Sequence, residues 1–333
     1  MTDRPTGPTV PQSVVILGAG TMGTGIALSF ANAGARVAVT ARRQSTLDDA
    51  RRRLHDSLEL MARHELVTAE AVELVPARVS MALFEDLDLD VDLVIESVTE
   101  DLAAKVDILR RTEAAAPART VLTTNTSSLS LRALSDALER PQNFAGFHWF
   151  NPPEIVALVE VIPGPGTSAQ TLRTLVDWAS AVRKVPVPIS SEVEGFIANR
   201  LQYALMREAY ALVERGICGL ADVDKVMRAC LGPRWAGVGP FEAMDLAGLD
   251  VHLEVARRLF PVLSNASEPP TLLERLVSQG ALGTKTGRGL HGDYDEATIG
   301  EARERRIAAL VALAAMDEGA RSDTAVGRRA RGS

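Results

Sequence analysis

A glycine-rich turn between an apolar strand and an apolar helix constrains the fold of this chain most strongly. Residues 13–17 are rich in β-branched residues and lead directly into Gly18, Gly20 and Gly23, after which an apolar helical pattern runs to Phe30. Gly34 ends that helix, and residues 36–40 supply a second buried strand. This order predicts a βαβ unit.

Further strand candidates follow at regular intervals with helical segments between them. They are expected at residues 79–81, 93–96, 121–124, 143–147 and 158–161. Residues 47–74 predict two antiparallel helices that are inserted beside the sheet. The alternation predicts an α/β fold whose N-terminal half is a Rossmann domain with a doubly wound, mostly parallel sheet.

A change in composition near residues 185–191 marks the expected end of the first domain. Beyond it, long amphipathic segments show no strand alternation, which predicts an all-α C-terminal domain. We expect a dinucleotide-binding domain at residues 1–190, an all-α substrate and dimerisation domain at 191–320, and a disordered tail at 321–333 that ends in a basic, polar run. A homodimer through the C-terminal helices is expected, because residues 196–215 and 241–260 carry more apolar positions than one thin layer needs.

Length and composition exclude several classes of protein. The 333 residues are enough for two cores, and a net charge of −7 argues against nucleic acid as a partner. No apolar run approaches the ~20 residues of a membrane span, and no signal-peptide pattern precedes the first strand. Two cysteines, Cys218 and Cys230, predict neither disulfides nor a metal site, which favours the cytoplasm.

The spacing of Gly18, Gly20 and Gly23 fits the dinucleotide fingerprint. In that fingerprint the first glycine allows the tight turn, the second lets the backbone approach a pyrophosphate, and the third lets helix and strand pack closely. Glycines in turns are common, so the spacing alone is weak. The strand before the turn and the helix after it favour a phosphate cradle over a turn without a ligand.

The end of the second strand bears on the choice between NAD and NADP. An NAD site usually carries an acidic residue there, whereas this chain has Ala41 followed by Arg42 and Arg43. A guanidinium at that point favours the 2′-phosphate of NADP. The two arginines could instead begin a solvated helix, or stack on the adenine of NAD, and the residues leave these alternatives open.

A histidine and a glutamate in neighbouring apolar strands form a candidate acid/base pair. His148 stands near a strand end before two prolines, and Glu160 lies inside the apolar run Leu158-Val159-Glu160-Val161. A lone histidine there is more often a core residue. A buried carboxylate is costly unless it is paired, and an imidazole partner would satisfy it while leaving the second ring nitrogen free to exchange a proton.

Over residues 13–294 the sequence resembles the 3-hydroxyacyl-CoA dehydrogenase family, which includes lambda-crystallin (gulonate dehydrogenase) and carnitine dehydrogenase. The motifs that carry the resemblance are Gly18-x-Gly20-x-Met22-Gly23-x-Gly25, Asn125-Thr126-Ser127-Ser128-Leu129, His148-x-Phe150-Asn151-Pro152, Leu158-Val159-Glu160-Val161 and Gly195-Phe196-Ile197-x-Asn199-Arg200-Leu201. Five motifs in one order are far more specific than any single one.

The resemblance implies roles for residues at these positions. His148 would be the general base for oxidation, Glu160 would orient it, and Ser127 and Asn199 would hold the substrate oxygens. The implied cofactor contacts are Gly18, Gly20, Thr21, Met22, Gly23, Glu100, Lys105 and Asn125. Without the resemblance, Ser127 reads equally well as a helix cap, Asn199 as a local hydrogen-bonding residue, and Glu100 and Lys105 as a solvated helix start.

Two departures limit what the resemblance implies about the substrate. Trp149 and the segment at residues 231–241 are more similar to the lambda-crystallin and carnitine branch, in which Arg234 could clamp a free carboxylate or lie on the surface. Leu290 stands where the family has an aromatic residue. For CoA phosphates the inserted helices offer Arg51, Arg52, Arg53, Arg63 and His64, which a solvated helix face explains equally well.

We therefore predict an NAD(P)-dependent oxidoreductase that acts on a short-chain 3-hydroxyacyl-CoA. The alternative substrate is a free small 3-hydroxy acid. Two other classes fit less well. A binding protein on a dehydrogenase scaffold would not need His148, Glu160, Ser127 and Asn199 together, and a 6-phosphogluconate-like enzyme would use a lysine where His148 stands.

Overall fold

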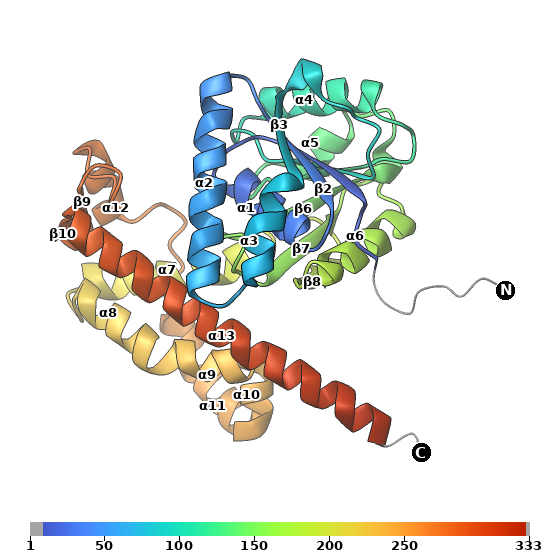
Figure 1. Cartoon of the computed structure of the whole chain (residues 1–333). Coiled ribbons are helices and arrows are strands. Elements are labelled where there is room, and N and C mark those ends of the chain that lie inside the picture. Colours follow the sequence, from blue (N-terminus) through green and yellow to red (C-terminus); the bar gives the residue numbers. More distant parts are fainter. Residues whose placement is uncertain (1–8, 331–333) are drawn as a thin grey trace. The chain divides into compact units, whose positions relative to one another are not determined.

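The structure is a computed structural model that describes residues 9–330, and its chain divides into two compact units (Figure 1). The divisions fall between Ile197 and Ala198 and between Ala309 and Leu310. The sequence placed the first boundary at residue 190. It lies later because the buried Phe196 packs with Leu131 and Ile162, which keeps the segment before it with the sheet.

Unit 1 contains an eight-stranded sheet in the order β3-β2-β1-β4-β5-β6-β7-β8. The strands are β1 (Ser13–Leu17), β2 (Arg36–Ala41), β3 (Val79–Leu83), β4 (Leu93–Glu96), β5 (Val121–Thr124), β6 (Phe144–Trp149), β7 (Leu158–Pro163) and β8 (Val185–Pro188). Every neighbouring pair is parallel except β6 and β7. The predicted doubly wound, mostly parallel sheet is thus confirmed, and its strand order reverses direction between β1 and β4.

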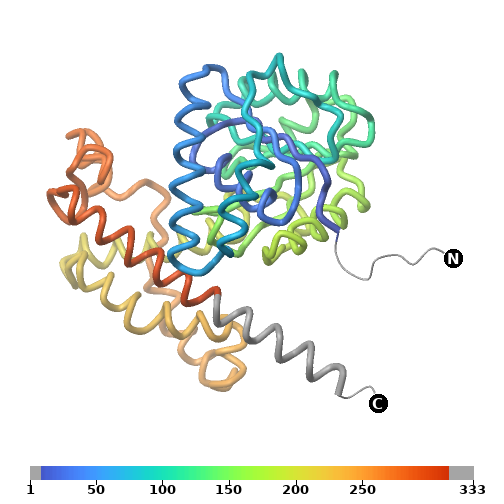
Figure 2. Tube along the Cα trace, viewed as in Figure 1, coloured from blue at the N-terminus to red at the C-terminus, as the bar shows by residue number. Residues whose placement is uncertain are grey.

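Strand alternation divides the core of unit 1 into two apolar clusters. Val14 and Ile16 of β1 belong to a cluster with Phe30, whereas Val15 and Leu17 belong to a second cluster with Leu109. The helices of this unit are α1 (Thr21–Asn32), α2 (Gln44–Arg63), α3 (Ala69–Ala77), α4 (Leu102–Ala115), α5 (Leu131–Ser135) and α6 (Ala169–Ala181). The predicted antiparallel pair of inserted helices, α2 and α3, can be followed in Figure 2.

Unit 2 is helical, as predicted. Its helices are α7 (Ala198–Glu214), α8 (Leu220–Val226), α9 (Gly232–Gly237), α10 (Pro240–Ala247), α11 (Leu249–Leu259) and α12 (Thr271–Ser278), with the π-helical segment Met227–Leu231 between α8 and α9. The sequence did not predict the two-residue antiparallel ladder of β9 (Arg288–Gly289) and β10 (Gly292–Asp293).

The last helix overlaps the segment, residues 321–333, in which we expected a disordered tail. Helix α13 (Glu296–Ala330) continues through that segment, which is rich in alanine and arginine, both strong helix formers. Residues 331–333 of the predicted tail lie outside the described residues. Among the helices described, none is long and apolar enough to cross a membrane.

The glycine-rich turn provides a matched pair of substitutions. Gly18 has φ +124° and a Cβ there would overlap the carbonyl oxygen of Ser97, whereas a Cβ at Gly20 would meet open space. Backbone strain of this kind costs about 1–3 kcal/mol before the overlap is counted. Gly18→Ala should therefore lower the Tm by about 5 °C or more, and Gly20→Ala should leave it unchanged. Thermal unfolding followed by circular dichroism checks this, and equal Tm values for the two variants would contradict it.

Candidate active site

The candidate active-site residues of unit 1 gather where parallel strands end at one edge of the sheet. Gly18 follows β1, Ser97 follows β4, Asn125 follows β5, and His148 is the penultimate residue of β6. The Asn125 side chain links two of these ends, because its Oδ1 accepts a hydrogen bond of 2.8 Å from the Trp149 N–H and its Nδ2 lies 3.4 Å from Ser97 Oγ. Carboxyl ends beside a switch point are where open α/β sheets bind ligands.

The turn after β1 fits the pyrophosphate of a dinucleotide. A Cβ at Gly23 would overlap the carbonyl of Gly18, so only glycine permits this close approach of helix and strand. At Gly20 the space is open, as a bound phosphate requires. Thr21 and Met22 begin α1, whose first turn holds no acidic residue and no side-chain cap, so its N–H groups are available to an anion.

The structure places Arg42 and Arg43 immediately after β2, which ends at Ala41. Both side chains are exposed, and Arg43 is the N-cap residue of α2. Within the described part of the chain neither guanidinium pairs with a carboxylate. The end of β2 therefore presents positive charge and no acid.

The predicted histidine and glutamate meet because of the antiparallel register of β6 and β7. His148 stands directly opposite Glu160, so the two side chains point to the same face of the sheet. Nδ1 of His148 lies 2.8 Å from Oε2 of Glu160, and both side chains are almost fully buried. The rings of Phe150 and Phe196 pack on the imidazole with centroids at 4.4 Å and 5.3 Å. The hydrogen bond and the two aromatic rings thus hold the imidazole in one orientation.

A backbone N–H group that the sequence did not predict also donates a hydrogen bond to Glu160. The N–H of Ile197 donates a hydrogen bond of 3.0 Å to the other carboxylate oxygen, Oε1 of Glu160. Gly195 and Phe196 before it both have positive φ values, +73° and +51°. This bend turns the backbone N–H of Ile197 toward the carboxylate, which gives a physical reason for the motif Gly195-Phe196-Ile197.

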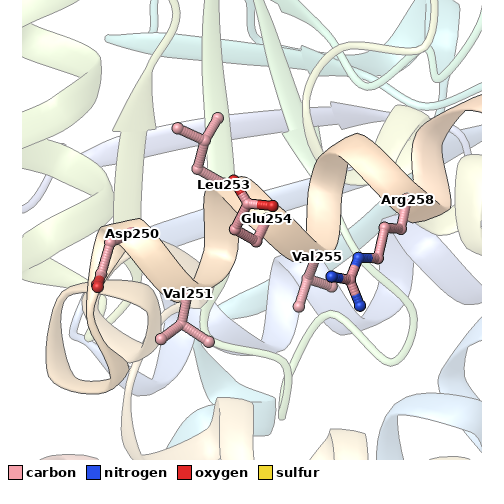
Figure 3. A pocket seen from close by; sticks show the side chains of 6 residues that line it. All are labelled: Asp250, Val251, Leu253, Glu254, Val255 and Arg258. Carbon is pink, nitrogen blue, oxygen red and sulfur yellow. The ribbon is translucent and has the colours of Figure 1, made fainter.

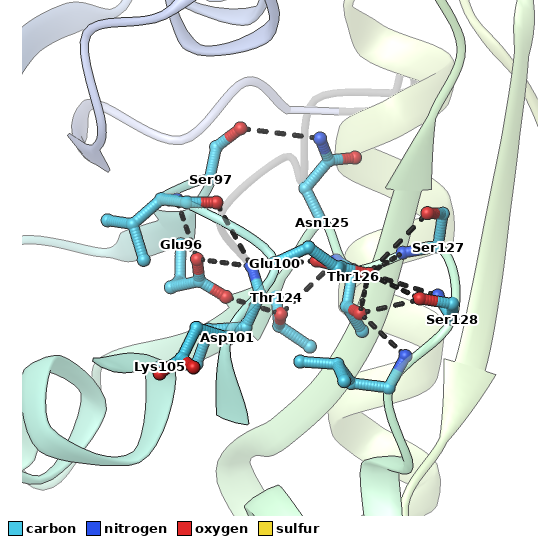
Figure 4. Close-up of polar contacts among 12 residues, drawn as sticks. Glu96, Ser97, Glu100, Asp101, Lys105, Thr124, Asn125, Thr126, Ser127 and Ser128 are labelled. Carbon is cyan, nitrogen blue, oxygen red and sulfur yellow. Dashed lines mark hydrogen bonds and ion pairs between the residues drawn. The ribbon is translucent and has the colours of Figure 1, made fainter. Parts of the chain in front are cut away.

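A second buried carboxylate belongs to Glu96, at the end of β4, and the sequence did not predict a role for it. Its Oε1 accepts hydrogen bonds from Lys105 Nζ (2.7 Å) and the Val98 N–H (2.7 Å), and its Oε2 accepts one from Thr124 Oγ1 (2.6 Å). Glu96 and Lys105 are almost completely buried. The lysine ammonium also lies 3.3 Å from Oε2 of Glu100, so it bridges two carboxylates (Figure 4).

Glu100 fixes the loop that carries Ser127. Its Oε1 accepts hydrogen bonds from Thr126 Oγ1 (2.6 Å), from the N–H groups of Ser127 (3.0 Å) and Ser128 (3.1 Å), and from Ser128 Oγ (3.0 Å) (Figure 4). Burial raises the pKa of Glu100, but these hydrogen bonds and the charge of Lys105 outweigh burial, so that the pKa falls from 4.5 to about 2. The carboxylate is therefore ionised at neutral pH.

Two predicted site residues belong to unit 2. Asn199 is the second residue of α7 and is partly buried. Arg234 lies in α9, is exposed, and has its Nη1 4.0 Å from Cys230 Sγ one turn earlier. Among the described residues no cluster of His, Cys, Asp and Glu could hold a metal ion, and both cysteines are free.

Comparison with known proteins defines the class. Residues 13–193 match the NAD-binding domain of 3-hydroxyacyl-CoA dehydrogenase, and residues 195–292 match its C-terminal domain. This chain therefore belongs to the 3-hydroxyacyl-CoA dehydrogenase family. It is an oxidoreductase of a family that uses NAD.

Individual relatives differ in substrate. The chain is 33% identical to 3-hydroxybutyryl-CoA dehydrogenase of Clostridioides difficile, over 86% of this chain and 100% of the relative. It is 32% identical to 5-formyl-3-hydroxy-2-methylpyridine 4-carboxylate 5-dehydrogenase of Mesorhizobium japonicum, over 84% and 90%. A crystal structure of the latter enzyme type, described as an NAD⁺-dependent dismutase, superposes with a TM-score of 0.86 and 29% identity over 93% of this chain and 99% of that one.

The lowered pKa of Glu100 gives a pH-dependent prediction. A carboxylate whose folded pKa is about 2, against an ordinary 4.5, stabilises the fold above pH 4.5 and loses that contribution as the pH falls toward 2. Glu100→Gln should lower stability at pH 7 by on the order of 1 kcal/mol, a value discounted for the exposed part of the side chain. The difference in Tm from wild type should shrink below pH 4.5.

Thermal unfolding between pH 7 and pH 3 measures this difference, with Glu73→Gln as the control because Glu73 is an exposed carboxylate on α3. A Glu100→Gln difference that stayed constant over this range would show that the ionised carboxylate does not hold the loop.

Proposed function

We propose that this protein interconverts a short-chain 3-hydroxyacyl-CoA and the corresponding 3-ketoacyl-CoA, with His148 as the acid/base. The single observation that carries the proposal is the buried pair of His148 and Glu160, whose Nδ1 and Oε2 atoms are 2.8 Å apart. A carboxylate at that distance holds the Nδ1–H tautomer and leaves Nε2 as a proton acceptor.

In the oxidation direction, His148 Nε2 takes the proton of the C3 hydroxyl group. Bound NAD or NADP would accept the hydride from the same carbon. The imidazolium that forms beside Glu160 is stabilised by the negative charge of that carboxylate, so the proton transfer requires little rearrangement. We assign Ser127 and Asn199 to the substrate oxygen, and Ser127 is suited to this because Glu100 fixes its loop.

For the cofactor we propose NAD or NADP, held by Gly18, Gly20, Thr21, Met22 and Gly23. The exposed Arg42 and Arg43 and the lack of an acid at Ala41 support acceptance of the 2′-phosphate. We assign Glu100, Lys105 and Asn125 to the part of the cofactor site that holds the nicotinamide. Since the three donor positions of Lys105 Nζ face Glu96, Glu100 and the Val98 carbonyl, we assign its effect on the cofactor to the placement of Glu100.

A second candidate substrate is a small carbonyl compound or hydroxy acid with a free carboxylate. Two observations favour it. The structural likeness to the pyridine carboxylate dehydrogenase extends over 93% of this chain. In addition, two of the arginines considered for CoA phosphates, Arg51 and Arg52, are already paired with Asp48 and Asp49 on their own helix. Arg234 would then bind the substrate carboxylate.

Initial rates with acetoacetyl-CoA and free acetoacetate, each with NADH and NADPH, separate these candidates. The primary proposal predicts that kcat/KM for the thioester exceeds that for the free acid by about 100-fold, because the CoA moiety supplies remote binding energy. Turnover of the free acid alone, abolished by Arg234→Ala, would establish the second candidate instead. Absence of turnover with all four combinations would contradict both.

We further propose a cytoplasmic homodimer. Two free cysteines without a disulfide support a reducing compartment. In the described part of unit 2, the helices α7 to α12 contain no buried residue, and Phe241 and Leu246 are 80% and 79% exposed. Val251 and Val255 of α11 are 53% and 44% exposed and point to one side of that helix (Figure 3). A second copy that brings the same face would cover these side chains.

Light scattering should give twice the 35.6 kDa mass of the chain at micromolar concentration. Leu246→Glu should shift the mass toward the monomer, because a charge at an apolar interface is costly. The matched control is Leu74→Glu, an exposed leucine on α3 in unit 1. A wild-type mass of 35.6 kDa would remove the dimer proposal.

A further inference from the structure

Three consecutive arginines on α2 differ in what they contact. Arg51 and Arg52 are exposed and pair with Asp48 and Asp49, one turn earlier on the same helix. Arg53 is partly buried and has no carboxylate partner in the described part of the chain. Its Nη2 donates a hydrogen bond of 2.6 Å to the carbonyl oxygen of Ala19, and its Nε is buried without any hydrogen-bond partner. The charge of Arg53 is therefore uncompensated.

The contact with Ala19 places the charge of Arg53 beside the glycine-rich turn. Ala19 lies between Gly18 and Gly20, so the Arg53 guanidinium is held against the turn that forms the phosphate cradle. The first turn of α1 contains no acidic residue, and its N-cap Gly20 has no side chain to accept from the free N–H groups. A guanidinium and a helix N-terminus thus converge where the protein provides no anion.

We propose that Arg53 binds the pyrophosphate of the dinucleotide cofactor. The guanidinium has five N–H donors, of which Ala19 takes one, so donors remain for phosphate oxygens while the arginine stays anchored on the turn. The inference rests on the proposed NAD(P)-dependent function and adds a side chain to a cradle otherwise made of backbone. Since NAD and NADP share the pyrophosphate, Arg53 contributes equally to both, unlike Arg42 and Arg43.

Binding of ADP-ribose, NADH and NADPH to the full chain, measured by calorimetry, tests this without turnover. Arg53→Gln should raise the Kd of all three by about 10-fold, the effect of one charge-assisted hydrogen bond. It should also weaken the dependence of Kd on salt concentration, because one ionic contact is lost. Arg53→Lys keeps the positive charge but loses the planar guanidinium, so its Kd values should lie between those of wild type and Arg53→Gln. The matched control Arg52→Gln should bind like wild type.

Several outcomes would overturn the assignment. An unchanged Kd for ADP-ribose in a folded Arg53→Gln variant removes the contact. A loss confined to NADPH assigns Arg53 to the 2′-phosphate instead. A weaker Kd with an unaltered salt dependence, together with a lower Tm, means that Arg53 only holds the turn. If wild-type protein bound none of the three nucleotides, the proposed function itself would fail.

Discussion

The acid/base pair depends on one buried carboxylate, which links its own strand to two other segments of the chain. Glu160 on β7 contacts the His148 imidazole on β6 through one oxygen and the Ile197 N–H through the other, at 2.8 Å and 3.0 Å. A buried carboxylate with one partner removed would cost several kcal/mol, so each contact stabilises the others. The antiparallel pairing of β6 and β7, an exception in an otherwise parallel sheet, is what sets these two side chains opposite each other.

The same physical rule shapes the neighbouring part of the sheet edge. Glu96 is buried at the end of β4, and Lys105 of α4 neutralises it while also reaching Glu100. Glu100 then orders the loop after β5 through the backbone N–H groups of Ser127 and Ser128. Glu96, Lys105 and Glu100 thus connect the core of the sheet to the loop that we assign to the substrate. Ser127 is positioned through Glu100 and not by packing into the core.

Much of this could be predicted from the sequence, because strand and helix periods and the glycine spacing are local signals. A carboxylate inside an apolar strand requires a partner, which predicts the pairing of Glu160 with His148. The same rule applies to Glu96, whose partner in the structure is Lys105. The Ile197 N–H and the Arg53 contact with Ala19 could not be found, since each depends on tertiary packing between segments distant in sequence.

The most direct test of the central claim is the turnover of His148→Gln beside that of Glu160→Gln, with cofactor affinity measured on the same samples. If the buried pair is the acid/base, His148→Gln loses about 10²–10⁴-fold in kcat and Glu160→Gln loses less, while both bind NADH like wild type. Undiminished turnover in folded His148→Gln protein would contradict the account and return the histidine to a structural role in the core.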